Sequence, residues 1–243
     1  MTGAPLGIGR LISDTVGLSF RSLPQLFLIG FVPALLSAGI AGLAGPSESD
    51  PMAGPSAADL WAGLIDLLLG TLVTGVLCLG ALDARLGKRH GVGQYLQQAA
   101  RHFVPLLVFG VVLSIAIAIG AFFLIVPGLY VAARYLPYVV TTVFEDRGWQ
   151  GTNRAEELTK GYRWPLVGTL LIFGIALIAL FMVAGIPAAA LGASLGLVPA
   201  ILVSAALTAV SYVIFAAFSA VVYLRLRELG EGTAPTEVAA EID

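Results

Sequence analysis

Charged residues are scarce in this chain. Only 13 Lys and Arg and 15 Asp and Glu occur among its 243 residues, about half the charge content of a typical soluble domain. The net charge is −2, and a chain so close to neutral cannot neutralise a run of phosphates, which excludes a nucleic-acid partner. The mean hydropathy of +0.94 instead indicates an integral membrane protein.

Cysteine and histidine are nearly absent, and this excludes several kinds of site. The one cysteine, Cys78, lies in an apolar run, so no intrachain disulfide and no C-x-x-C motif can form. The two histidines, His90 and His102, match no zinc motif. The segment 192–196 matches G-x-S-x-G but has neither a histidine partner nor a strand-to-helix turn, so we interpret it as a packing or turn segment. We therefore expect no enzyme, no metal and no cofactor.

Long apolar segments are abundant and predict an all-α polytopic membrane protein. Backbone groups inside a bilayer must bond within their own helix, and about 20 apolar residues are enough to cross it. We expect six transmembrane helices, at about 24–44, 60–82, 104–124, 128–144, 165–185 and 198–224. Residues 1–229 then form a single membrane domain of three helical hairpins. The small, acidic segment 230–243 is expected to be a disordered cytoplasmic tail.

The basic residues indicate how the chain is oriented. Twelve of the 13 lie before the first span, after the second, after the fourth or after the sixth, and the alternate connections contain none. By the positive-inside rule, both termini are cytoplasmic. The alternative for the first span is a secretory signal sequence cleaved near residue 45.

A pattern of arginine, aromatic residue and proline opens the first, third and fifth spans. The arginines are Arg21, Arg101 and Arg163, and a short amphipathic segment precedes each span. The pattern predicts a unit of interfacial helix and helical hairpin, repeated three times. The alternative is that polytopic proteins commonly place basic amphipathic helices at the inner surface without any repeat. In either case we expect these three arginines to contact lipid headgroups.

Two charged residues lie inside the expected spans. Asp66 follows Leu60 by six residues and Arg134 follows Gly128 by six, so each lies about 9 Å from the outer end of its span. The two are expected to form an ion pair in the outer half of the bundle. This pair would be structural or would mark a substrate or proton path, and separate snorkelling to the interface is a third possibility. Pro137 is expected to kink the helix beside Arg134.

Three short motifs in residues 124–164 resemble a known family. In order, they are an I-x-P-G segment that ends in Arg134, a proline followed by Glu145, and R-A-E-E-L-T-K-G from Arg154 to Gly161. They are similar to those of bacterial membrane proteins grouped with the membrane domain of glycerophosphoryl diester phosphodiesterases, except that Ala155 replaces a serine. The matching motif residues are Pro127, Gly128, Glu145, Arg154, Glu157, Leu158, Thr159 and Gly161. The resemblance implies a six-span fold in a bacterial inner membrane. It implies no particular activity, because the phosphodiesterase barrel that carries the family's catalysis has no counterpart among these spans.

Two functions from different classes fit these observations. The first is a non-catalytic inner-membrane protein that binds a partner or organises lipids at the inner leaflet, with membrane lipids and another membrane protein as its partners. The alternative is a transporter, or a carrier of lipids or small molecules, that uses a layer formed by Asp66 and Arg134. The sequence does not predict an oligomeric state.

Overall fold

A computed structural model describes residues 6–44, 57–88, 90–123, 125–187, 190, 196–233 and 237–238. These residues form helices and no strand, which confirms the all-α prediction. The principal helices are α1 (Ile8–Ala44), α2 (Ala57–Leu86), α3 (Val92–Arg101), α4 (Phe103–Phe123), α5 (Ile125–Tyr135), α6 (Tyr138–Val143), α7 (Gly151–Thr159), α8 (Arg163–Leu180) and α10 (Leu197–Glu231). A π-helical turn, Phe181–Gly185, extends α8.

Five of the described helices are long and apolar enough to cross a membrane. They are α1, α2, α4, α8 with its π-helical extension, and α10, and they are compatible with a multi-pass membrane protein. The expected span 128–144 is not among them, because α5 ends at Tyr135 and α6 begins at Tyr138. Pro137 lies between the two; it lacks an N–H, and its ring clashes with the preceding turn. We predicted a kink here, but the structure has two short helices instead.

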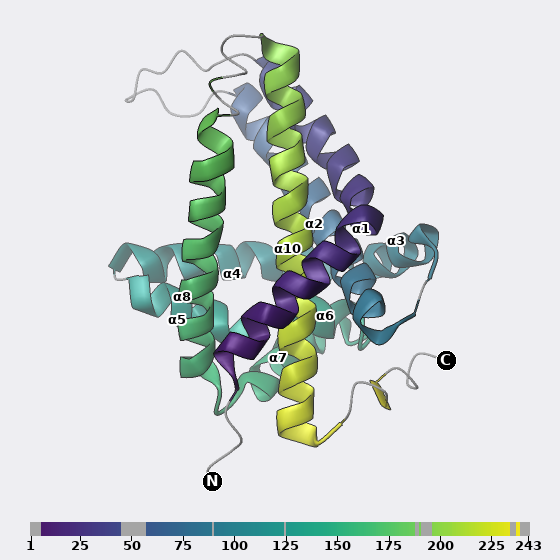
Figure 1. Ribbon diagram of the computed structural model, residues 1–243, viewed down its shortest axis with the longest axis vertical. Helices are drawn as coiled ribbons and strands as arrows, with labels where there is room; N and C mark the ends of the chain where they lie inside the picture. Colours follow the sequence, from purple (N-terminus) through teal and green to yellow (C-terminus); the bar gives the residue numbers. More distant parts are fainter. Residues whose placement is uncertain are drawn as a thin grey trace.

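The helices are arranged around α10 (Figure 1). This helix packs along α1 and α2, α5 packs against both α4 and α8, and α4 runs crosswise to α8 and α10. The start of α1 and the end of α10 lie at the same end of the molecule. We call this end, with α3, α7 and the start of α8, the charged end.

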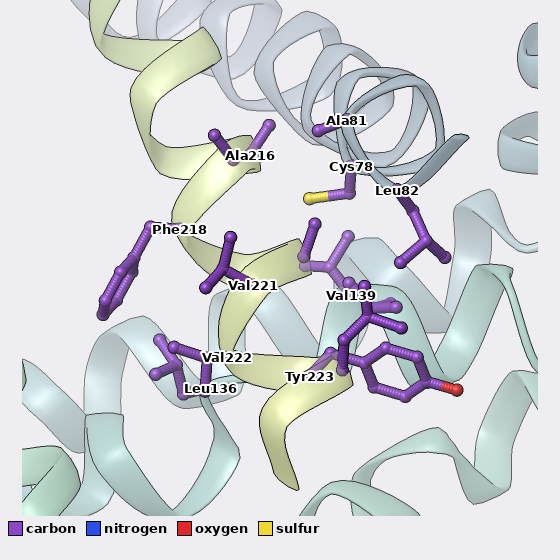
Figure 2. Packing of buried hydrophobic residues seen from close by; sticks show 14 of the residues in the cluster. Cys78, Ala81, Leu82, Leu136, Val139, Ala216, Phe218, Val221, Val222 and Tyr223 are labelled. Carbon is purple, nitrogen blue, oxygen red and sulfur yellow. The ribbon is translucent and has the colours of Figure 1, made fainter. Parts of the chain in front are cut away.

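The main core lies where the second half of α10 meets α2 and α6 (Figure 2). Small side chains on α10, such as Ala216, let the neighbouring helices approach, and Phe218, Val222 and Tyr223 are almost fully buried. Cys78 of α2 is also buried there, as expected of a small core residue.

The predicted units of interfacial helix and hairpin differ from one another. Separate short helices, α3 and α7, precede α4 and α8, but the first amphipathic segment and the first span form one continuous helix. Proline is tolerated inside long membrane helices, and α1 contains Pro24 and Pro33. The threefold repeat therefore stays a prediction.

Several predictions fall wholly or partly on residues outside the described ranges. These include the connection 45–56, most of the G-x-S-x-G segment and most of the tail. Of the predicted disordered tail, residues 230 and 231 belong to α10, which ends before the left-handed Gly232. Val238 is fully buried in the core, which is contrary to disorder at this residue.

Candidate functional site

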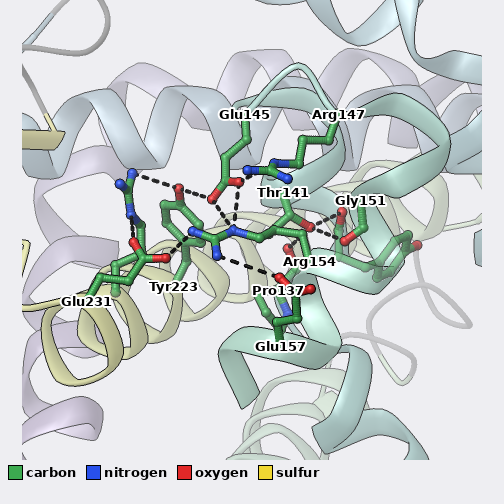
Figure 3. Close-up of polar contacts among 11 residues, drawn as sticks. Pro137, Thr141, Glu145, Arg147, Gly151, Arg154, Glu157, Tyr223 and Glu231 are labelled. Atoms are coloured by element: carbon green, nitrogen blue, oxygen red, sulfur yellow. Dashed lines mark hydrogen bonds and ion pairs between the residues drawn. The ribbon is translucent and has the colours of Figure 1, made fainter. Parts of the chain in front are cut away.

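Glu145 is the centre of a charged network between α6, α7 and α10 (Figure 3). Its Oε2 accepts hydrogen bonds from Nε of Arg147 at 2.9 Å and from Nε of Arg154 at 3.0 Å. Its Oε1 accepts a hydrogen bond from the hydroxyl of Tyr223 at 2.8 Å. Only 10% of the Glu145 side chain is exposed, so these bonds replace most of the water that an ionised carboxylate needs.

A second carboxylate completes the network. Glu231, in the last turn of α10, pairs with Arg154 and accepts a hydrogen bond from Nε of Arg227 at 3.0 Å. Arg227 also donates to the hydroxyl of Tyr223 at 3.3 Å. Arg154 and Arg227 are therefore matched by Glu145 and Glu231, and the network ties α7 to α10.

The sequence predicted only part of this network. Glu145 and Arg154 belong to the quoted motifs, and the structure brings them together. Tyr223, Arg227 and Glu231 were missed, because they lie in α10, far from the motifs in sequence. Tyr223 follows Glu145 by 78 residues and Glu231 follows Arg154 by 77, and no local pattern links them. Arg227 and Glu231 are four residues apart in one helix, which places them on the same face, and this spacing is the signal that could have suggested a pair.

The other motif residues have architectural roles. The hydroxyl of Thr159 donates to the carbonyl of Arg134 at 2.8 Å and so links α7 to the end of α5. Leu158 is buried, and Gly161 adopts a φ of +91° in the turn before α8. Gly128 packs against α4 beside Pro127, whereas the Glu157 side chain is 71% exposed.

A polar cavity of about 670 Å³ opens beside the network. Asp83 also lines this cavity, and its Oδ2 accepts a hydrogen bond from the Tyr95 hydroxyl at 2.7 Å and contacts Nδ1 of His90 at 2.5 Å. Burial, together with the hydrogen bond to Asp83, raises the pKa of Tyr95 to about 12. Tyr95 therefore stays a neutral donor at physiological pH.

The predicted ion pair of Asp66 and Arg134 is not formed. Asp66 accepts a hydrogen bond from Ser37 of α1 at 2.6 Å, whereas Nη2 of Arg134 donates to Glu156 of α7 at 2.5 Å. The reason is the break at Pro137, which ends α5 one residue after Arg134 and brings this arginine to the charged end. A basic residue in a last turn also interacts favourably with the helix dipole.

Arg163 approaches the same carboxylate as Arg134. Its Nη2 lies 3.3 Å from Glu156 Oε1, and its Nη1 donates to the hydroxyl of Tyr130 at 3.4 Å. The hydrogen bond from Arg134, with the positive charges of Arg134 and Arg163, lowers the pKa of Glu156. The other two predicted headgroup contacts, Arg21 and Arg101, are exposed.

Comparison of the chain with family models, curated proteins and solved structures finds no match. The resemblance to the membrane-domain family stays a prediction.

Proposed function

We propose that this chain is a non-catalytic, multi-pass protein of a bacterial inner membrane that organises anionic lipids at the inner leaflet. The observation that carries the proposal is the separation of charge along the molecule. Arg134 was the one basic residue expected away from the cytoplasmic side, and its bond to Glu156 of α7 supports grouping it with the other basic residues. The predicted outer side keeps only acidic charges, namely Glu48, Asp50, Asp59 and Asp66.

The orientation of the helices is consistent with this proposal. The start of α1 and the end of α10 lie at the same end (Figure 1), as expected if both termini are cytoplasmic. Juxtamembrane basic residues are each attracted to the anionic inner leaflet by about 1 kcal/mol. The exposed Arg21 and Arg101 are suited to such contacts.

The polar residues of the apolar helices favour lipid organisation over transport. The hydroxyls of Thr15, Thr71 and Thr169 each donate to the carbonyl four residues earlier in their own helix. Ser19 and Ser211 do the same. Because these hydroxyls already donate to the backbone of their own helix, few polar groups remain to line a path for a substrate. The layer of Asp66 and Arg134, on which the transport alternative depended, is also not formed.

A lipid titration of the purified protein tests the proposal. We expect phosphatidylglycerol to raise the melting temperature in mild detergent and phosphatidylcholine to raise it much less, because only the first carries a net negative charge. High salt should reduce the difference, since exposed charges are screened. Equal responses to both lipids would contradict the proposal.

A further inference from the structure

Two arginines share one carboxylate where α5, α7 and α8 meet. Arg134 and Arg163 both approach Oε1 of Glu156, at 2.5 Å and 3.3 Å. Two guanidinium charges thus face a single negative charge, which leaves the cluster with one excess positive charge. The network around Glu145 differs, because its positive and negative charges balance. Its three arginines, Arg147, Arg154 and Arg227, meet three carboxylates, namely Glu145, Glu231 and the more distant Glu157.

The two guanidinium groups also have hydrogen-bonding capacity to spare. Each carries five N–H donors. The contacts to Glu156 and Tyr130 use Nη2 of Arg134 and the two terminal nitrogens of Arg163. Nε of Arg134 and Nε of Arg163 are buried and have no partner. Each terminal nitrogen of a guanidinium carries two N–H groups, and these contacts use at most one of them, so the cluster can bond an additional anion with several acceptor oxygens.

Aromatic residues place the cluster at the level of the lipid headgroups. Trp164 follows Arg163 at the start of an apolar helix, and its side chain is largely exposed. The Tyr130 and Trp164 rings lie 5.8 Å apart. Tryptophan and tyrosine concentrate at the membrane–water interface, where lipid phosphates also lie.

We propose that Arg134 and Arg163 form a binding site for one phosphate group, and that Glu156 occupies part of this site and limits its affinity. Arginine is suited to this role because its planar fork of donors matches phosphate geometry. The source of the phosphate rests on the proposed function, in which it belongs to an anionic lipid. The phosphate chemistry itself does not depend on that source.

Three variants of the full chain test the site. Phosphatidylglycerol is titrated into the protein in mild detergent, and bound lipid is counted by native mass spectrometry. We expect Arg134→Gln and Arg163→Gln each to weaken binding about tenfold, because each removes charge-assisted hydrogen bonds. Glu156→Gln should instead tighten it, because it removes the competing carboxylate. Lys160→Gln, a nearby exposed basic residue, is the matched control and should leave the affinity unchanged.

The opposite signs separate ligand binding from a structural role. A purely structural cluster would lower the melting temperature of all three variants without tightening binding in Glu156→Gln, and that result would overturn the site. Arg163→Lys keeps the positive charge but loses the planar set of guanidinium donors, so it should bind the lipid with intermediate affinity. This variant still tests the site if Arg163→Gln does not fold.

Parallel titrations with inorganic phosphate identify the source. Protection by inorganic phosphate that is lost in Arg163→Gln, without retention of lipid by the unaltered protein, would support the site and overturn the proposed function. Retention of lipid that is equally strong in all variants would support the proposed function and overturn the site.

Discussion

At the scale of single residues, Glu145 joins three partners of the charged end. It accepts hydrogen bonds from Arg147, Arg154 and Tyr223, and its removal would leave Arg154 with Glu231 and with the exposed Glu157, which lies 3.9 Å away. Breaking a buried ion pair costs much more than breaking an exposed one, because the remaining charge loses both its partner and its water.

We predict that Glu145→Gln lowers the free energy of unfolding by about 3 kcal/mol. Glu157→Gln is the matched control: Glu157 lies 3.9 Å from the same arginine but is 71% exposed, and its loss should cost less than about 0.5 kcal/mol. Denaturation in mild detergent checks both values. Equal losses in the two variants would show that burial of Glu145 is not what makes its pairing important.

A second prediction concerns pH. The pKa of Glu156 lies below its ordinary value of 4.5 because Arg134 donates a hydrogen bond to it. Stability from this pair is therefore fully present above the ordinary value and is lost as the pH falls through the lowered pKa. The stability difference between the unaltered protein and Glu156→Gln should be constant from pH 7 to about 5 and should shrink below about pH 4.5. A difference that is already shrinking above pH 5 would contradict this assignment.

At the scale of helices, apolar length predicted three of the candidate spans, α2, α4 and α8, within a few residues at both ends. The expected 104–124 corresponds to α4 at Phe103–Phe123, and 165–185 to α8 and its π-helical turn. The predicted span 128–144 was wrong, because the apolar length of a segment does not show whether a proline inside it kinks the helix or ends it. It also failed to predict that α1 continues through Pro24 as one helix. The segment before Pro24 is packed as well, because Leu11 and Leu18 are buried and Asp14 pairs with Arg85 of α2.

The crossing of α4 and α5 gives a third prediction. A Cβ atom on Gly128 would lie 2.8 Å from the backbone nitrogen of Ala121 and 2.9 Å from the carbonyl oxygen of Ile117, and backbone atoms cannot rotate away. Gly128→Ala should therefore destabilise the protein by about 1–3 kcal/mol. Gly174→Ala, where no atom would lie within 4 Å, should be neutral or slightly stabilising. Melting temperatures of the two variants check this, and equal values would mean that the helices do not cross closely here.

At the scale of the whole molecule, the charge pattern along the sequence predicted which segments share a side. The pairing of Arg154 with Glu231 and of Arg85 with Asp14 joins segments that the pattern assigned to the cytoplasm. The charge pattern could not predict these partners, because they depend on how the helices pack.

Orientation provides a fourth prediction. Cys78 is buried, so labelling of introduced cysteines has little background. A membrane-impermeant maleimide should label Ala57→Cys, an exposed position at the start of α2, on the periplasmic side of spheroplasts, and should label the exposed Lys160→Cys only after the membrane is permeabilised. Labelling in the reverse order would invert the orientation and remove the basic residues from the inner leaflet.

Under the proposed function, the charged end holds anionic lipids. The most direct measurement is native mass spectrometry of the protein gently extracted from its own membrane, with no lipid added. We expect masses that correspond to bound anionic phospholipids, enriched over zwitterionic ones relative to the surrounding membrane. Retention of a stoichiometric protein partner, without any enrichment of anionic lipid, would contradict the claim and favour a partner-binding function instead.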